Sequence, residues 1–241
     1  MIKLGEHAEF WREARTSKYT PEEIQQLLAQ YASDGMISWY VKKVEDKNFK
    51  TLEKLLAGDT IEKRIALLPY VSKEFTEQVG QDVMERGTLV EKYNYALKTP
   101  DRKYIKTIED QMYESNDIYM IENFACYVKG ADQKRAEEYI LVHGNDDQKI
   151  NFLFEAKDCD KQRVYNGVEF KIRVPQYVYR YQRKDASKMY DALIKLENKE
   201  LVESYFKGHE NEDVSVLEEF AKTDTQKAFY AKLAQNAALQ R

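Results

Sequence analysis

Between Lys161 and Lys188 the sequence combines basic and aromatic side chains, a combination suited to binding rather than to bond making. The segment holds eight Lys or Arg residues against two acids, and five aromatic side chains are interleaved with them. Cations pair with phosphates or carboxylates, while aromatic rings stack on bases or pack in protein interfaces. We predict that the partner-binding residues are Lys171, Arg173, Tyr177, Tyr179, Arg180, Tyr181 and Arg183.

Three interpretations of this segment stay open at the level of sequence. The tyrosines belong to a helical core beneath a solvated charged face, or the segment meets an acidic protein surface, or it binds nucleic acid. The whole chain carries a net charge of −4, and neither half of it is basic. A general phosphate-binding role is therefore excluded, and any contact with nucleic acid is confined to this segment.

The residue types that usually carry catalysis do not form a recognisable pattern. His7, His143 and His209 have no second His or Cys at metal-ligand spacing. There is no glycine-rich phosphate loop and no nucleophile elbow. The acidic stretches 145–147 and 209–213 lack the spacing of a calcium loop, which favours solvated turns. We predict no cofactor, no metal and a non-enzymatic role, with an enzyme as the open alternative.

The two cysteines indicate a reducing compartment rather than a disulfide framework. Cys126 is predicted to be a core thiol, and Asp158 and Asp160 flank Cys159, where they raise a thiol pKa. The first residues lack the apolar stretch of a signal peptide, and no apolar run is long enough to span a membrane. We expect a cytoplasmic protein without membrane association, or one in the host cytoplasm if it is viral.

The elements that position these residues are predicted to be helices. Helix formers recur with helical periodicity, and only 9 Gly and 4 Pro are present. Thr20 and Glu23 predict a capping box, while Ser72 begins and Gly87 ends another helix. The alternating stretch Val168–Val174 is compatible with a short strand, but a helix or loop is the default. We predict an all-α chain of roughly twelve to fourteen short helices.

A repeat lies in the middle of the chain. Asn123–Arg135 and Asn151–Arg163 align without gaps and share Asn, Phe, Lys, Asp and Arg at equal positions. The aromatic is expected on the buried face of a first helix, the Lys near the end of that helix, and the Asp as the cap of a second helix. One such hairpin cannot bury its apolar face alone, so neighbouring hairpins must stack. Weaker copies are centred on Asp46, Asp101, Asp185 and Asp224.

Part of this region resembles a known tandem repeat. The resemblance is carried by Tyr119, Phe124-Ala125, Val128-Lys129-Gly130-Ala131-Asp132 and the turn at 143–146. This helical-hairpin repeat of about 28–30 residues reads YIYxFAKxVKGADxxKLxxAIIxxGD and occurs in bacterial and phage proteins of unassigned function. The resemblance covers residues 117–163. It implies an α-solenoid and a phage or mobile-element origin, but no activity, since the motif consists of capping and packing residues.

These observations predict a single helical-repeat domain over residues 1–241. Its N-terminal cap covers about residues 1–45, its clearest repeats about 88–163, and divergent repeats 164–241. The predicted function is a non-enzymatic scaffold that binds a partner protein. The alternative is a nucleic-acid-binding repeat protein, similar in layout to helical-repeat DNA glycosylases, that uses residues 161–188. The oligomeric state is not determined by the sequence.

Overall fold

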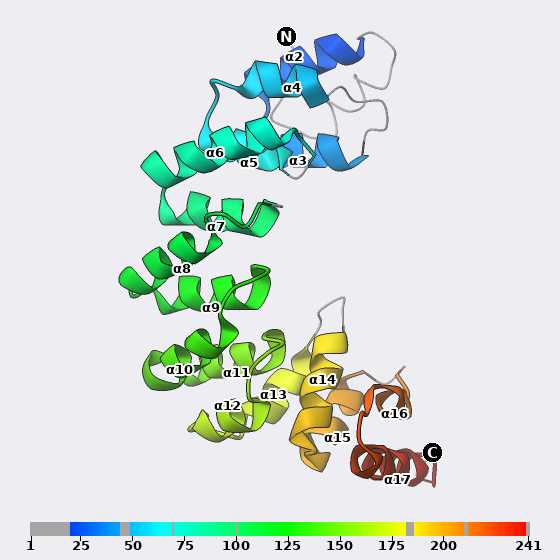
Figure 1. Ribbon diagram of the computed structural model, residues 1–241. Coiled ribbons are helices and arrows are strands. Elements are labelled where there is room, and N and C mark those ends of the chain that lie inside the picture. The colour runs from blue at the N-terminus through cyan, green and yellow to red at the C-terminus, as the bar shows by residue number, and fades with distance from the viewer. Residues whose placement is uncertain are drawn as a thin grey trace. The chain divides into compact units, whose positions relative to one another are not determined.

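The computed structural model describes residues 20–43, 49–68, 70–99, 101–181, 186–209 and 212–239. These residues form sixteen helices and contain no strand, which confirms the all-α prediction (Figure 1). The number exceeds the expected twelve to fourteen because several helices are only one or two turns long. None of the helices in the described ranges is both long and apolar enough to cross a lipid bilayer.

The chain divides into two compact units, each described by itself. The first comprises the chain up to Ser115 together with Val128–Gly130. Within it, successive helices pack on the next helix or on the one after it. Its helices are α2 (Pro21–Tyr31), α3 (Asp34–Lys43), α4 (Phe49–Leu56), α5 (Ile61–Leu67), α6 (Lys73–Arg86), α7 (Leu89–Lys98) and α8 (Ile105–Glu114).

The helix ends of the first unit lie where the sequence signals predicted them. Thr20 and Glu23 form the predicted capping box at α2, with Glu23 N donating to Thr20 Oγ1 at 3.2 Å. Ser72 caps α6, and Gly87 is the C-cap of that helix. These caps satisfy main-chain amides that have no partner inside the helix, so they can be recognised locally.

The second unit comprises Asn116–Tyr127 and the chain from Ala131 onward. Here α9 packs on α10, α10 on α11 and α11 on α12. Helices also meet the next but one, so that α9 contacts α11, α10 contacts α12 and α13 contacts α15. Its helices are α9 (Ile118–Tyr127), α10 (Gln133–His143), α11 (Asp146–Glu155), α12 (Lys161–Gly167), α13 (Arg173–Arg180), α14 (Ser187–Leu196), α15 (Lys199–Gly208), α16 (Val216–Phe220) and α17 (Asp224–Leu239).

The two best copies of the repeat adopt the local structure predicted for them. Phe124 on α9 and Phe152 on α11 are buried. Asp132 caps α10 and Asp160 caps α12, each accepting a main-chain hydrogen bond at 3.0 Å from the residue three positions later. The aromatic and the Asp therefore act as predicted in both hairpins.

The weaker copies differ from the predicted frame. Asp101 accepts from Lys103 N in a turn before α8 and does not cap that helix. At the start of α17, Thr223 Oγ1 accepts from Gln226 N, whereas Asp224 is the first helical residue. Asp46 and Asp185 lie outside the described residues, as do residues 1–19 of the predicted N-terminal cap. A short polar side chain one residue before the Asp can cap the helix in its place, so the position of the capping residue varies among the weaker copies.

The ambiguous segment 164–178 is helical on both sides of a turn. Helix α12 ends at Gly167, and α13 begins at Arg173. Pro175 lies in the first turn of α13, where a missing amide costs nothing because no intrahelical acceptor exists there. The alternation between 168 and 174 therefore reflects a helix end, a turn and a helix start, and the strand alternative is wrong.

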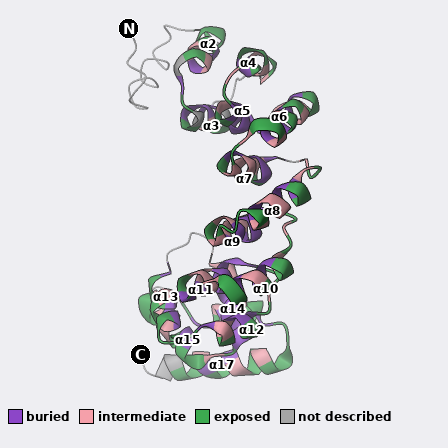
Figure 2. Cartoon of the chain, turned by 90° about the vertical axis from the view of Figure 1, so that its left-hand side faces the viewer, coloured by how far each residue is buried: buried purple, intermediate pink, exposed green. Residues whose placement is uncertain are grey.

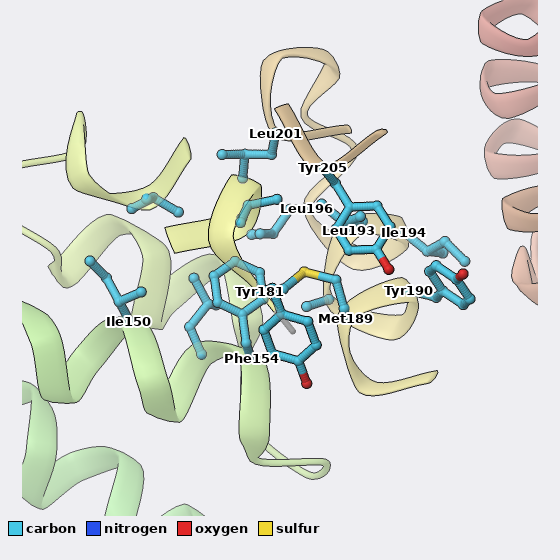
Figure 3. Close-up of a cluster of buried hydrophobic side chains, with 14 of the residues drawn as sticks. Ile150, Phe154, Tyr181, Met189, Tyr190, Leu193, Ile194, Leu196, Leu201 and Tyr205 are labelled. Atoms are coloured by element: carbon cyan, nitrogen blue, oxygen red, sulfur yellow. The ribbon is translucent and has the colours of Figure 1, made fainter. Parts of the chain in front are cut away.

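A continuous apolar core runs through the second unit (Figure 3). Phe154, Met189 and Leu193 are completely buried in it, and Tyr205 is 1 % exposed. The helices turn their buried sides toward this core and their exposed sides outward (Figure 2). Because the residues of this core come from α9 through α17, no single hairpin is expected to keep its structure alone.

Helices α13 and α15 approach each other most closely where Gly208 ends α15. A Cβ atom at Gly208 would overlap the carbonyl oxygen of Tyr179 on α13 and lie 3.0 Å from its carbonyl carbon. The next residue, His209, lies with Nε2 2.5 Å from Tyr181 O and with Nδ1 2.9 Å from Tyr205 O. The absence of a side chain at 208 therefore sets the distance between the ends of the two helices.

We predict that Gly208→Ala lowers the free energy of unfolding by about 2 kcal/mol, because the added methyl group forces the two backbones apart. The measurement is urea unfolding followed by circular dichroism. Gly58→Ala is the matched control, since a Cβ there meets no atom within 4 Å. Equal stability of the two variants would show that α13 and α15 separate without cost.

We also predict that Asp132→Ala and Asp160→Ala each lower the free energy of unfolding by about 1 kcal/mol, because the first turns of α10 and α12 lose their caps. Asp132→Asn and Asp160→Asn are the controls. Asparagine caps as well as aspartate does, so the amide variants should retain most of the stability in the same urea titration. Equal losses for Ala and Asn would show that charge, not capping, matters.

Candidate functional site

Helices α11 and α13 are joined by three side-chain contacts in constant register. Arg173 pairs with Asp147, with 2.7 Å between Nη2 and Oδ1. Tyr177 donates to Asn151 at 3.1 Å, and Tyr181 donates to Glu155 at 3.3 Å. Both members advance by four residues from one contact to the next, so the two helices run parallel with matched turns. We call these three contacts the α11–α13 ladder.

The turn before α13 is fixed by two charged side chains. Asp146, at the start of α11, accepts from the amides of Glu169 and Phe170 at 2.9 and 2.7 Å. These bonds hold the pKa of the Asp146 carboxyl below its usual range. Lys171 donates to three carbonyl oxygens at the end of α12, the closest at 2.8 Å. The start of α13 is thereby anchored to α11 and α12.

A groove of about 540 Å³ lies between the two helices of the ladder. Its floor contains Ile150 and Tyr181, which are buried, whereas the side chains of Asp147 and Arg173 are 69 % and 46 % exposed. The lining is mixed, with charged, amide and aromatic side chains beside one aliphatic residue, Ile150. The lining residues are Asp147, Ile150, Arg173, Gln176, Tyr177, Arg180 and Tyr181.

Four of the seven predicted partner-binding residues line this groove: Arg173, Tyr177, Arg180 and Tyr181. The other three do not. The ammonium group of Lys171 is used in the turn, Tyr179 is exposed but does not line the groove, and Arg183 lies outside the described residues. The groove therefore gathers the predicted residues at positions 173, 177, 180 and 181, which recur with the spacing of one helical face.

The hydroxyl groups of the two groove tyrosines are held by α11. Tyr177 donates to Asn151 and Tyr181 donates to Glu155. The Tyr177 ring also stacks on Phe154 with 5.3 Å between centroids and an interplanar angle of 10°. The orientation of the half-buried Tyr177 ring is thus fixed, which lowers the entropy cost of packing a ligand against it.

The Arg180 guanidinium differs from the other cations of the segment. Among the described residues it forms no hydrogen bond or ion pair, although it lines the groove. Arg173 is paired with Asp147, and Lys188 is paired with the buried Glu155 at 3.1 Å. Of the groove cations in the described part of the chain, Arg180 is accordingly the one that remains available to a ligand.

Two buried carboxyl groups lie beneath the ladder. Glu155 is 2 % exposed and accepts from Tyr181 and Lys188. Glu122 is 3 % exposed and accepts from the side-chain amide of Asn151. Burial raises the pKa of Glu122 to about 7, and the negative charge of Glu155 adds to the shift. Asn151 therefore connects the groove tyrosine Tyr177 to a carboxyl group that titrates near neutrality.

Sequence reasoning missed three lining residues. Gln176 shares the face of Arg173 and Arg180, so it would follow once the segment is recognised as a helix. Asp147 and Ile150 belong to α11, and no local signal places them opposite α13. Their positions depend on the offset of 26 residues between ladder partners, which differs from the offset of 28 in the sequence repeat.

The other groups considered for chemistry do not assemble. Burial raises the pKa of both thiols, so Cys126 and Cys159 are protonated and poor nucleophiles at neutral pH. Cys126 is a buried core thiol, as predicted. His143 is the last residue of α10, where a helix-end role was expected. In the described parts of the chain, no group of three or more His, Cys, Asp or Glu residues is placed to hold a metal ion.

Comparison with protein-family models, with curated proteins and with solved structures finds no match to this chain. The resemblance of residues 117–163 to a phage and bacterial repeat therefore stays a prediction. Function has to be argued from the α11–α13 groove itself.

We predict that Glu122 makes stability depend on pH. Its carboxyl has a higher pKa in the folded chain, about 7, than its ordinary value of 4.5. The folded state therefore binds more protons between these values, and the free energy of unfolding falls as pH rises from 4.5 to 7. Glu122→Gln removes this contribution. The free energy of unfolding of the variant, relative to that of the wild type, should therefore rise by up to about 3 kcal/mol between pH 5 and pH 8.

Urea unfolding of wild type and Glu122→Gln at pH 5 and pH 8 measures this difference. Glutamine still offers an oxygen to Asn151, so the hydrogen bond survives in the variant. Glu138→Gln, at an exposed position of α10, is the control and should show the same pH dependence as the wild type. If the difference in free energy of unfolding between Glu122→Gln and the wild type is the same at both pH values, the raised pKa of Glu122 is contradicted.

Proposed function

We propose that this chain is a non-enzymatic helical-repeat scaffold that binds a partner protein in the α11–α13 groove. We also propose that its hairpins stack as an α-solenoid. The observation that carries the binding proposal is the available Arg180 guanidinium in a preformed groove that also holds the oriented aromatic ring of Tyr177. Arginine and tyrosine are the side chains most favoured at the energetic centres of protein interfaces.

The α-solenoid proposal is supported by the order of helix packing inside the second unit. The first helices of successive hairpins, α9 and α11, contact each other, as do the second helices α10 and α12. The ladder makes α11 and α13 parallel in the same manner. Stacks in which each helix meets the equivalent helix of the next hairpin build extended binding surfaces.

Exposed apolar side chains next to the groove support a protein partner. Phe170 is 59 % exposed and Ile172 is 74 % exposed, and they lie three residues and one residue before the groove residue Arg173. Apolar surface of this kind beside a pocket with a central arginine is typical of protein contacts.

The state of the cations weighs against the nucleic-acid alternative. Affinity for nucleic acid grows with the number of phosphates that Lys and Arg neutralise. Within the described residues, however, Lys171 is bound to carbonyl oxygens, while Arg173 and Lys188 are paired with carboxylates. Several cations that the structure describes in this segment are therefore already engaged within the fold, which leaves fewer of them for phosphates and favours a protein partner.

We predict that Arg180→Glu reduces capture of the partner at least tenfold, because a carboxylate replaces the available cation at the groove. The measurement is affinity capture from the native lysate with nuclease treatment, read by quantitative mass spectrometry. Lys134→Glu on α10 is the matched control, since it makes the same change of charge at an exposed residue that does not line the groove.

Capture that depends on Arg180 but not on Lys134 supports the proposal. Capture that is equal in both variants would place the binding surface elsewhere. Recovery that collapses on nuclease treatment would instead support the nucleic-acid alternative.

A further inference from the structure

The groove already contains a carboxylate bound to a guanidinium. Asp147 Oδ1 and Oδ2 lie 2.7 and 3.0 Å from Arg173 Nη2. Both side chains are well exposed, at 69 % and 46 %, so little holds this pair together apart from its own attraction. A carboxylate from another chain can take the place of Asp147 at small cost.

Arg180 offers a second, equivalent position. It lies seven residues after Arg173 on the same face of α13, a separation of about 10 Å along the helix axis. The Tyr177 ring comes between the two guanidinium groups in the sequence and lines the same groove. The groove thus carries two guanidinium positions with an aromatic surface between them, one filled by Asp147 and one open.

From this arrangement, and resting on the proposed function, we propose that the groove recognises an acidic extended segment of the partner protein. The segment places one carboxylate at Arg180 and a second at Arg173, where it displaces Asp147. An apolar residue between them packs on the Tyr177 ring. Asp147 is therefore an internal competitor that mimics the ligand and lowers its affinity.

The spacing of the two guanidinium positions fits an extended segment. A polyproline II segment rises about 3.1 Å per residue with three residues per turn. Carboxylates at positions i and i+3 of such a segment therefore lie about 9 Å apart on one side, which matches the spacing of Arg173 and Arg180.

The test uses a short fluorescein-labelled peptide with two glutamates three residues apart and a leucine and a proline between them. Binding to the full chain is measured by fluorescence anisotropy at low salt. Arg180→Gln should weaken binding at least fivefold. Asp147→Asn should strengthen it about fivefold, because Arg173 becomes available without competition.

Glu138→Gln is the matched control for Asp147→Asn, since it removes one negative charge from an exposed position on α10, which does not line the groove. It should leave the affinity unchanged, which separates local competition from the overall change in charge. A peptide with glutamines in place of the glutamates should not bind saturably. Thermal unfolding of each variant checks that the fold is retained.

The proposal is overturned if Asp147→Asn binds no better than Glu138→Gln, or if the glutamine peptide binds as well as the acidic one. These results are distinguishable from failure of the proposed function. If capture of the native partner still depends on Arg180 while the acidic peptide does not bind, the groove is a protein-binding site of another specificity. If neither depends on Arg180, both proposals fall.

Discussion

The constant register between α11 and α13 is the constraint on which the candidate site depends. Each rung joins residues four positions further along both helices, from Asp147 and Arg173 through Asn151 and Tyr177 to Glu155 and Tyr181. A four-residue step keeps side chains on one face of each helix, so a single slip would break all three contacts together. The groove lies between the two parallel helices whose register these contacts define.

Parallel helices require a return segment, and this explains the construction around the ladder. Helix α12 brings the chain back, and the turn after it is fastened by Asp146 and Lys171. At the other end of α13, Gly208 and His209 bring α15 against its last turn. Both ends of an eight-residue helix are thus fixed by neighbours, which compensates for the weak stability of so short a helix.

The polar groups beneath the ladder are expensive to bury, but they specify its arrangement. Glu155 has two donors, Tyr181 and Lys188, and Glu122 has the side-chain amide of Asn151. Removing one partner would leave a buried polar group unsatisfied, so each contact excludes alternative registers. The same contacts turn the hydroxyl groups of Tyr177 and Tyr181 toward α11 and leave the half-buried Tyr177 ring at the groove. Specificity of packing and the character of the binding surface therefore have one physical origin.

The sequence by itself determined the features that depend on a few neighbouring residues. Helix composition, the caps at Thr20, Ser72, Asp132 and Asp160, and the buried Phe124 and Phe152 follow from local hydrogen bonding and periodicity. The candidate residues Arg173, Tyr177, Arg180 and Tyr181 were also predictable, since they belong to a segment in which basic and aromatic side chains are interleaved.

Only the tertiary structure decided which of these residues line a groove and which charged side chains already have a partner. Asp147 and Ile150 face α13 because helices 26 residues apart pack in parallel, and no local pattern encodes that distance. The sequence likewise could not show that Lys171 is used in a turn while Arg180 stays available. Charge composition is a local property, whereas pairing of charges is decided by the long-range packing that brings distant helices together.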